Sequence, residues 1–306
     1  MSLRAVKQIL GTKPTIEGAG VKLQRAFGFG KTAEFDPFLL LDDFRNENPA
    51  DYLAGFPWHP HRGIETITYV LAGEVAHGDS LGNNGLMTAG DVQWMTAGSG
   101  ILHQEMPKGD ERGRMHGFQL WANLPAALKM TAPRYQDIAS SAIPEVTEDD
   151  GTKARIICGD FWGNRGPVEG VATESMAVDA RYVDISVPPL KRKRIQVETT
   201  RNAFAYVFAG AGTFRDASDP RAVLTESAVD PNADPVYDAK NHSLVLFDQG
   251  DEIVVQAGPE GIRFLLVSGK PLKEPVAWYG PIVMNTQAQL TQAMTELQIG
   301  TFIKHP

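Results

Sequence analysis

A five-residue pattern that occurs twice is the strongest constraint on how this chain can fold. The segment Tyr69–Gly73 reads YVLAG, and the segment Tyr206–Gly210 reads YVFAG. A second pattern, Gly-Asp followed by Ala-Gly and Gly-Ile, occupies residues 90–101 and returns at residues 250–262. Patterns that recur in the same order indicate one structural unit present in two copies. The chain is therefore expected to contain the same unit twice.

Each copy has the residue pattern of β-strands. Short runs rich in Val, Ile, Phe and Thr, such as Thr66–Leu71, are separated by clusters of Gly, Pro, Asn and Asp. This punctuation is typical of a β-sandwich or a β-barrel. With 306 residues, the chain is long enough for about two domains. We therefore predict an all-β fold with domains at residues 1–132 and 133–306.

One helix is expected near the end of the chain. The segment Thr286–Gln289 has the form of a capping box, and Gly300 provides a stop signal. Between them, four apolar residues fall on one helical face: Leu290, Ala293, Met294 and Leu297. This apolar stripe is expected to pack against a barrel.

Composition excludes several classes of protein. Nowhere is an apolar run long enough to span a membrane, and Met1–Pro14 lacks the apolar core of a signal peptide, so we expect a cytoplasmic protein. Cys158 is the only cysteine, which excludes an internal disulfide and a cysteine-rich metal site. The net charge of −8 argues against direct nucleic-acid binding and makes a protein partner more plausible than DNA. The basic run Lys191–Arg194 is interpreted as a solvated edge.

Two pairs of residues have the spacing and chemistry of metal ligands. His59 and His61 are two residues apart, and so are His103 and Glu105. On a β-strand, residues two apart point to the same face, so two inward-facing strands could surround one ion. Three imidazoles and a carboxylate suit iron, nickel, copper, manganese or zinc with coordination positions left open. Open positions indicate catalysis rather than scaffolding.

The alternative is that these histidines are ordinary core or surface residues, because a chain with seven histidines can place two of them two apart by chance. The internal repeat argues against this interpretation. The whole ligand set occurs in the first copy and is absent from the second, where the equivalent positions hold Gln196, Glu198, Arg263 and Leu265. One copy is therefore expected to be catalytic and the other supportive.

Long and specific strings in this sequence resemble the pirins, a bicupin family. They include FLLLDDF at Phe38–Phe44, HPHRG at His59–Gly63, GDVQWMTAG at Gly90–Gly98 and WYGP at Trp278–Pro281. The resemblance covers nearly the whole chain and implies two β-barrel cupin domains, built as double-stranded β-helices and lying face to face. It also implies an iron ion, Fe(II), in the N-terminal barrel, held by the residues at His59, His61, His103 and Glu105.

The resemblance implies two classes of function. Some pirins are quercetin 2,3-dioxygenases, which open the central ring of a flavonol with O2 and release carbon monoxide, and we favour this reading. Others are metal- and redox-dependent regulators that bind a transcription factor or a metabolic enzyme. In the enzymatic reading, the substrate's hydroxyl and carbonyl chelate the metal and a carboxylate takes the hydroxyl proton.

Two carboxylates compete for the role of base. Glu105 is either a permanent ligand or one that leaves the metal to accept the proton. Glu65 has the same parity as His59 and His61, and its spacing fits the general cupin ligand pattern. The pirin resemblance favours Glu105 as the ligand and leaves Glu65 as an inward-facing neighbour, with a surface glutamate as the alternative. Four further residues could line an aromatic pocket or belong to the core: Trp94, Met95, Phe118 and Trp121.

Overall fold

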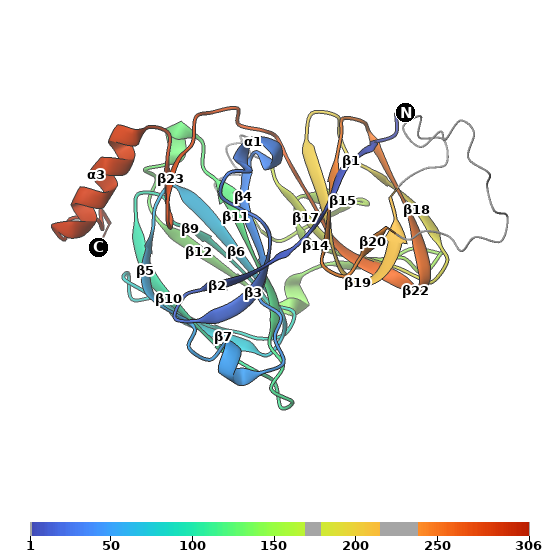
Figure 1. Cartoon of the computed structure of the whole chain (residues 1–306), viewed down its shortest axis with the longest axis horizontal. Helices are drawn as coiled ribbons and strands as arrows, with labels where there is room; N and C mark the ends of the chain where they lie inside the picture. The colour runs from blue at the N-terminus through green and yellow to red at the C-terminus, as the bar shows by residue number, and fades with distance from the viewer. Residues whose placement is uncertain (1, 169–178, 215–237, 306) are drawn as a thin grey trace.

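The computed structural model describes residues 2–168, 179–214 and 238–305, and its strands form two barrel-like bodies that lie against each other (Figure 1). The prediction of a mainly β fold with two related units is confirmed. Within the described residues, no helix is both long enough and apolar enough to cross a membrane.

The first barrel is built from a seven-stranded and a four-stranded antiparallel sheet. In order across the larger sheet, the strands are β12 (Arg134–Ile138), β9 (Val92–Thr96), β6 (Ile64–Ala72), β11 (His116–Asn123), β4 (Phe38–Asp43), β3 (Val21–Phe27) and β2 (Lys13–Glu17). The smaller sheet runs β5 (Phe56–His61), β10 (Ile101–Lys108), β7 (Glu74–Asp79) and β8 (Asn84–Met87). This smaller sheet carries both predicted ligand pairs.

The second barrel is a nine-stranded sheet. Its main path is β1 (Val6–Gly11), β21 (Ser243–Phe247), β19 (Asn202–Thr213), β22 (Glu252–Gly269), β17 (Arg181–Val187), β14 (Lys153–Cys158) and β13 (Glu145–Thr147). Strand β18 (Arg192–Gln196) pairs with β22, and β20 (Ala239–Lys240) pairs with β19. Buried aliphatic and aromatic side chains fill its interior, including Val183, Ile195, Val207 and Phe264. Among the described residues, this barrel holds no group of His, Cys, Asp or Glu side chains that could bind a metal ion.

Short elements complete the chain. They are α1 (Thr32–Phe35), η1 (Pro49–Asp51), η2 (Ala126–Leu128), η3 (Ser140–Ala142), the strand pair β15 (Asp160–Phe161) and β16 (Asn164–Arg165), the strand pair β23 (Ala277–Tyr279) and β24 (Ile282–Met284), and α3 (Gln287–Gln298). The predicted capping box is present, because the Thr286 side chain accepts from the Gln289 amide and the Gln289 side chain accepts from the Thr286 amide. Leu290 and Ala293 of α3 are buried, as the apolar stripe predicts.

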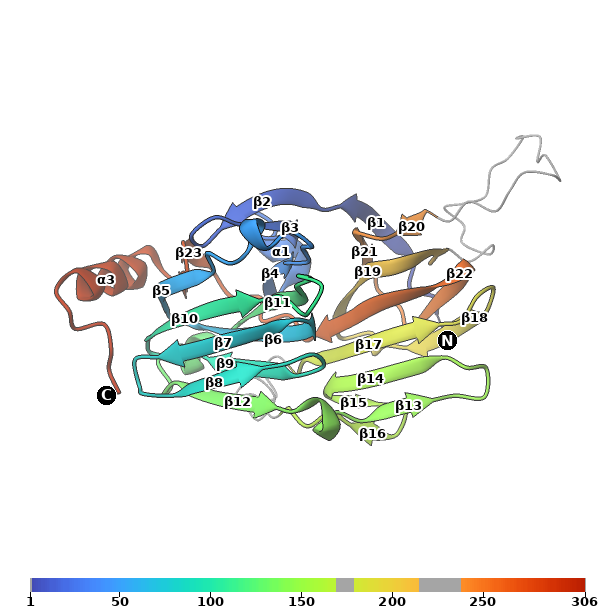
Figure 2. The ribbon, with the colours of Figure 1, turned by 90° about the horizontal axis from the view of Figure 1, so that it is seen from below.

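A shared apolar core joins the two bodies, and the repeated strands β6 and β19 both contribute to it. Ile67 and Tyr69 of β6 belong to the same buried cluster as Phe204 and Tyr206 of β19. Seen from below, the first and second barrels meet along β6 and β17 (Figure 2). The internal repeat therefore produces two units that bury equivalent faces against each other.

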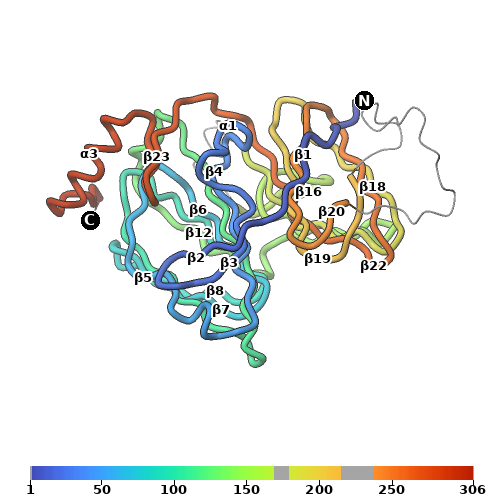
Figure 3. The backbone as a smooth tube through the Cα atoms, viewed as in Figure 1, coloured from blue at the N-terminus to red at the C-terminus, as the bar shows by residue number. Residues whose placement is uncertain are grey.

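Both ends of the chain cross to the other body (Figure 3). Strand β1 pairs with β21 of the second barrel, while α3 and the C-terminus lie beside the first barrel. Strand β12 begins after residue 132 but pairs with β9 of the first barrel. The domain boundary at residue 132/133 stays a prediction. Strands on either side of it pair with the sheet of the other barrel. The C-terminal crossing matters for function, since it brings β23 and β24 to the ligand-bearing strands.

Candidate metal centre

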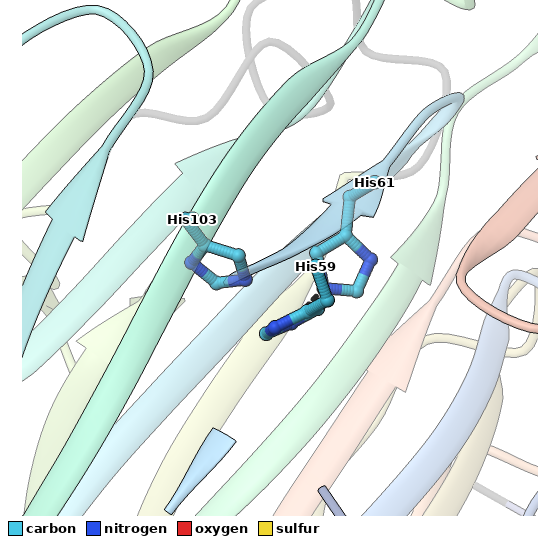
Figure 4. Close-up of side chains that lie close together, drawn as sticks. All are labelled: His59, His61 and His103. Atoms are coloured by element: carbon cyan, nitrogen blue, oxygen red, sulfur yellow. Dashed lines mark hydrogen bonds between the residues drawn. The ribbon is translucent and has the colours of Figure 1, made fainter. Parts of the chain in front are cut away.

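Strands β5 and β10 bring the three predicted histidine ligands together (Figure 4). The two strands are antiparallel, with His103 directly opposite His59 and Ile101 opposite His61. Along β10, the buried side chains alternate with more exposed ones, so His103 and Glu105 are both buried. The sequence alternation is therefore realised as one inward-facing set.

The histidine rings converge closely enough to bind one ion. One nitrogen from each of His59, His61 and His103 lies within 4.8 Å of the others. The Nε2 atoms of His59 and His61 are 3.1 Å apart, and the ring centroids of His59 and His103 are 4.4 Å apart. His61 and His103 are each 1% exposed, and His59 is half-buried. The three ring nitrogens could therefore hold one ion, with His59 as the most exposed of the three ligands.

Backbone carbonyls fix the orientation of two of these rings. The Nδ1 atom of His59 lies 2.8 Å from the Pro57 carbonyl oxygen, and that of His61 lies 3.2 Å from the Pro281 carbonyl oxygen. A carbonyl only accepts, so each Nδ1 carries the proton and each Nε2 presents a lone pair. This is the outer support that metal-binding histidines commonly have.

Two lone pairs therefore face each other, a contact that a cation would stabilise and that two neutral imidazoles alone would not. Burial lowers the pKa of His59, and it lowers the pKa values of His61 and His103 well below the ordinary histidine value. Neutral imidazole is the form that binds metal. Neither ring nitrogen of His103 has a hydrogen-bond partner among the described residues, which suits a ligand. The residues present thus fit a metal ion.

Glu105 lines the same pocket as His59 and His61, but it is not part of the group of converging ligand atoms. Its carboxylate is buried, and its Oε1 lies 3.2 Å from the Thr68 hydroxyl, which is also 2.5 Å from Gln119 Oε1. Burial raises the pKa of Glu105 to about 7, although the Thr68 hydroxyl opposes this rise. A carboxyl group poised near neutrality can exchange protons at physiological pH. Its role as fourth ligand stays a prediction.

Glu65 lies on the face of β6 opposite to that of Thr68, the residue that contacts Glu105. Its side chain accepts a hydrogen bond of 2.7 Å from Thr96, and it follows the alternation of Ile67 and Tyr69 toward the core between the barrels. The even-numbered Thr68 faces Glu105 instead. The expectation that Glu65 shares a face with the histidines therefore does not hold. The alternation of side chains does not continue from His61 to Glu65, because β5 ends at His61 and a turn intervenes before β6 begins.

A pocket of about 600 Å³ opens beside the histidines. His59, His61, Glu105, Thr68 and Gln119 contribute polar groups to it, and the charged residues Glu17, Arg25 and Asp42 also line it. Most of the remaining wall is apolar and includes the aromatic residues Phe29, Phe44, Tyr52, Phe56, Trp58, Trp121 and Trp278. Such a pocket suits a flat aromatic molecule with a few oxygen atoms at one end.

Only one of the four residues considered for an aromatic wall lies on this pocket. Trp121 lines it, with its ring 5.1 Å from that of His61. Trp94 and Phe118 belong to the core between the barrels, and Met95 packs in a separate buried cluster. These three are thus core residues, the alternative that the sequence left open.

The sequence did not indicate how the C-terminal segment takes part. Trp278 and Pro281 both line the pocket, although they lie more than 170 residues beyond Glu105. The string WYGP belongs to the family resemblance, so it marked the segment without revealing its place. Thr68 and Gln119 gave no signal in the sequence, because isolated polar residues on strands are common.

Family models match both halves of the chain. The model described as Pirin matches residues 20–122, and the model described as Pirin C-terminal cupin domain matches residues 182–303. The chain belongs to the pirin family. The bicupin fold expected from the sequence is thereby confirmed, with a single C-terminal helix longer than one turn in the described residues.

Relatives align over almost the full length. A pirin-like protein from Caulobacter vibrioides is 42% identical over 303 residues, covering 99% of this chain and 100% of the relative. A Pseudomonas aeruginosa protein named "Putative quercetin 2,3-dioxygenase" is 38% identical, covering 97% of each. Among solved structures, quercetin 2,3-dioxygenase from Acinetobacter baumannii superposes with a TM-score of 0.83 at 28% identity, covering 98% of each chain. The pirin fold thus extends over both barrels.

Proposed function

We propose that this pirin is a metal-dependent dioxygenase that opens the central ring of a flavonol such as quercetin with O2. The observation that carries the proposal is the convergence of the His59, His61 and His103 ring nitrogens beside an aromatic pocket. The names of the relatives from Pseudomonas aeruginosa and Acinetobacter baumannii support the same reaction class.

Each side chain has a defined task in this proposal. His59, His61 and His103 hold the ion, and Glu105 either completes the ligand set or accepts the proton of the flavonol hydroxyl. When bound, the metal supplies Lewis acidity that lowers the pKa of that hydroxyl. Trp121, Trp58 and the other aromatic walls bind and orient the rings, and they exclude water from the reacting end.

Iron is the metal that we propose, as Fe(II), by analogy with the pirin family. The mixed nitrogen and oxygen donor set would also accept manganese, nickel, copper or zinc. Glu105 would be deprotonated when it binds an ion, since coordination favours the carboxylate form. Metal loading should therefore be weaker in acid than at neutral pH.

The deciding experiment measures oxygen uptake with quercetin after anaerobic reconstitution with ferrous iron. We expect uptake that depends on quercetin and falls at least about 100-fold in His103→Ala and in Glu105→Gln. The matched control is Glu111→Gln, because Glu111 is exposed and lies outside the pocket.

Absence of uptake by fully metal-loaded protein would contradict the enzymatic proposal. That outcome would favour the regulatory class, in which the loaded metal controls binding to a protein partner. A pull-down comparing Fe(II)- and Fe(III)-loaded protein would then be the appropriate measurement.

A further inference from the structure

We propose that Lys129 is a positioning residue for the metal centre: it holds the C-terminal strand pair in place so that the Pro281 carbonyl fixes the His61 ring. The inference rests on the proposed metal site but not on the identity of the substrate. It assigns to the last 30 or so residues of the chain a role in a site whose ligands all come from the first barrel.

The strand pair β23–β24 contacts the centre directly. The turn between the two strands places the Pro281 carbonyl oxygen 3.2 Å from His61 Nδ1. Immediately beyond, the Val283 amide donates to the Arg62 carbonyl at 3.0 Å, and Ile282 bridges to Arg62 in parallel fashion. The strand that begins directly after Pro281 is therefore paired with the residue that follows His61.

Lys129 links these same two segments. Its Nζ donates to the Gly63 carbonyl at 2.8 Å, to the Val283 carbonyl at 3.0 Å and to Asn123 Oδ1 at 2.7 Å. Lys129 is only 1% exposed, and a protonated amine has three N–H groups to match these three acceptors. One acceptor lies two residues after His61, and another lies two residues after Pro281.

A second buried basic residue, Arg62, links the segment that follows His61 to the C-terminal helix and tail. Arg62 is 2% exposed, donates to Glu296 Oε2 at 2.7 Å and to the Phe302 carbonyl at 2.7 Å, and lies 4.1 Å from the centre of the Phe302 ring. Helix α3 and the tail beyond it are thereby attached to the residue next to His61.

The backbone at Gly63 also packs directly against the backbone of β24. Gly63 adopts φ +79°, and a Cβ atom there would overlap the Val283 carbonyl. Three sets of contacts act on residues 61–63, which include the predicted ligand His61. They are the backbone contact with Val283, the hydrogen bonds of Lys129 and those of the Arg62 side chain. A purely stabilising role would not require the contacts to gather at that point, so positioning of His61 is the better account.

The test compares Lys129→Met with the unaltered protein, using Co(II) as the probe. We expect Co(II) affinity to fall about tenfold or more, as when outer partners of metal ligands are removed. The ligand-field absorption spectrum of bound Co(II) should also change, because the His61 ring is no longer held. In Lys108→Met, which removes an exposed lysine, both properties should stay unchanged.

A destabilised control separates positioning from loss of stability. Tyr206→Phe removes a hydrogen bond between the barrels and should lower the melting temperature without changing Co(II) affinity or spectrum. If Lys129→Met does not fold, Glu296→Gln weakens the contact that α3 makes with Arg62, and a smaller change in the same spectrum is expected.

Co(II) affinity and spectrum that match the unaltered protein, in a variant whose melting temperature has fallen, would overturn the inference. The proposed dioxygenase function fails by a different observation, which is absence of oxygen uptake by protein that binds metal normally. The two failures are therefore distinguishable.

Discussion

The hydroxyl of Tyr69 in the first barrel donates a hydrogen bond of 2.9 Å to Asp184 in the second. The reciprocal bond is also present, because Tyr206 of the second barrel donates at 2.9 Å to Asp43 of the first. Tyr69 and Tyr206 are the first residues of the two copies of the repeated pattern. The repeat thus ties the metal-binding barrel to its partner through two equivalent buried contacts.

Tyr206→Phe should lower the free energy of unfolding by about 1–3 kcal/mol, because it removes one donor from the fully buried Asp43 carboxylate. Urea denaturation of the metal-free protein measures the change. Tyr279→Phe, which alters an exposed tyrosine, serves as the control. A Tyr206→Phe midpoint equal to that of the control would show that the contact contributes nothing.

Thr68→Val should reduce quercetin-dependent oxygen uptake by about tenfold while leaving the fold unchanged, since valine has nearly the same shape and lacks the hydroxyl beside Glu105. The iron content of the loaded protein is measured alongside the rate. Thr147, an exposed strand residue outside the pocket, provides the matched Thr147→Val control. Equal rates in the two variants would mean that Thr68 does not position Glu105.

His116 predicts a loss of stability in acid that is separate from the metal site. It lies in a mostly buried position 3.8 Å from Asp43. Burial lowers the pKa of His116 to about 4, an effect that Asp43 opposes and that Arg45, Arg263 and His242 reinforce. In the unfolded state His116 becomes protonated below about pH 6.5, whereas in the folded state it stays neutral until the pH approaches 4. Stability from this group is present above about pH 6.5 and is lost as the pH falls toward 4.

In numbers, His116 should account for about 2 kcal/mol of the stability lost between pH 7 and pH 5. Urea denaturation at both pH values, for the unaltered protein and for His116→Gln, measures this share as the difference between the two losses. An identical loss in both proteins would contradict the lowered pKa.

Alternation along strands was enough to predict much of the site. His59 with His61, and His103 with Glu105, each point into the same barrel because the period of two holds within β5 and within β10. It failed for Glu65, because counting across the turn at residues 62–63 assumed that one strand continued. Local periodicity is reliable inside an element and carries no information across a turn.

Contacts between distant segments could not be predicted. Three such contacts depend on how complete sheets pair and pack. They are the pairing of β1 with β21, the pairing of β12 with β9, and the approach of Pro281 to His61. No local property of WYGP shows which carbonyl will face an imidazole. The capping box at Thr286, by contrast, depends only on neighbouring residues and was predicted from them.

The central claim is that three histidines of the first barrel bind one metal ion, and elemental analysis tests it most directly. The protein would be loaded anaerobically with Fe(II), desalted and analysed alongside His59→Ala, His61→Ala, His103→Ala and the control His242→Gln, whose histidine lies outside the cluster. We predict about one iron per chain in the unaltered protein and the control, and almost none in the three alanine variants. Equal iron content in all five proteins would contradict the account.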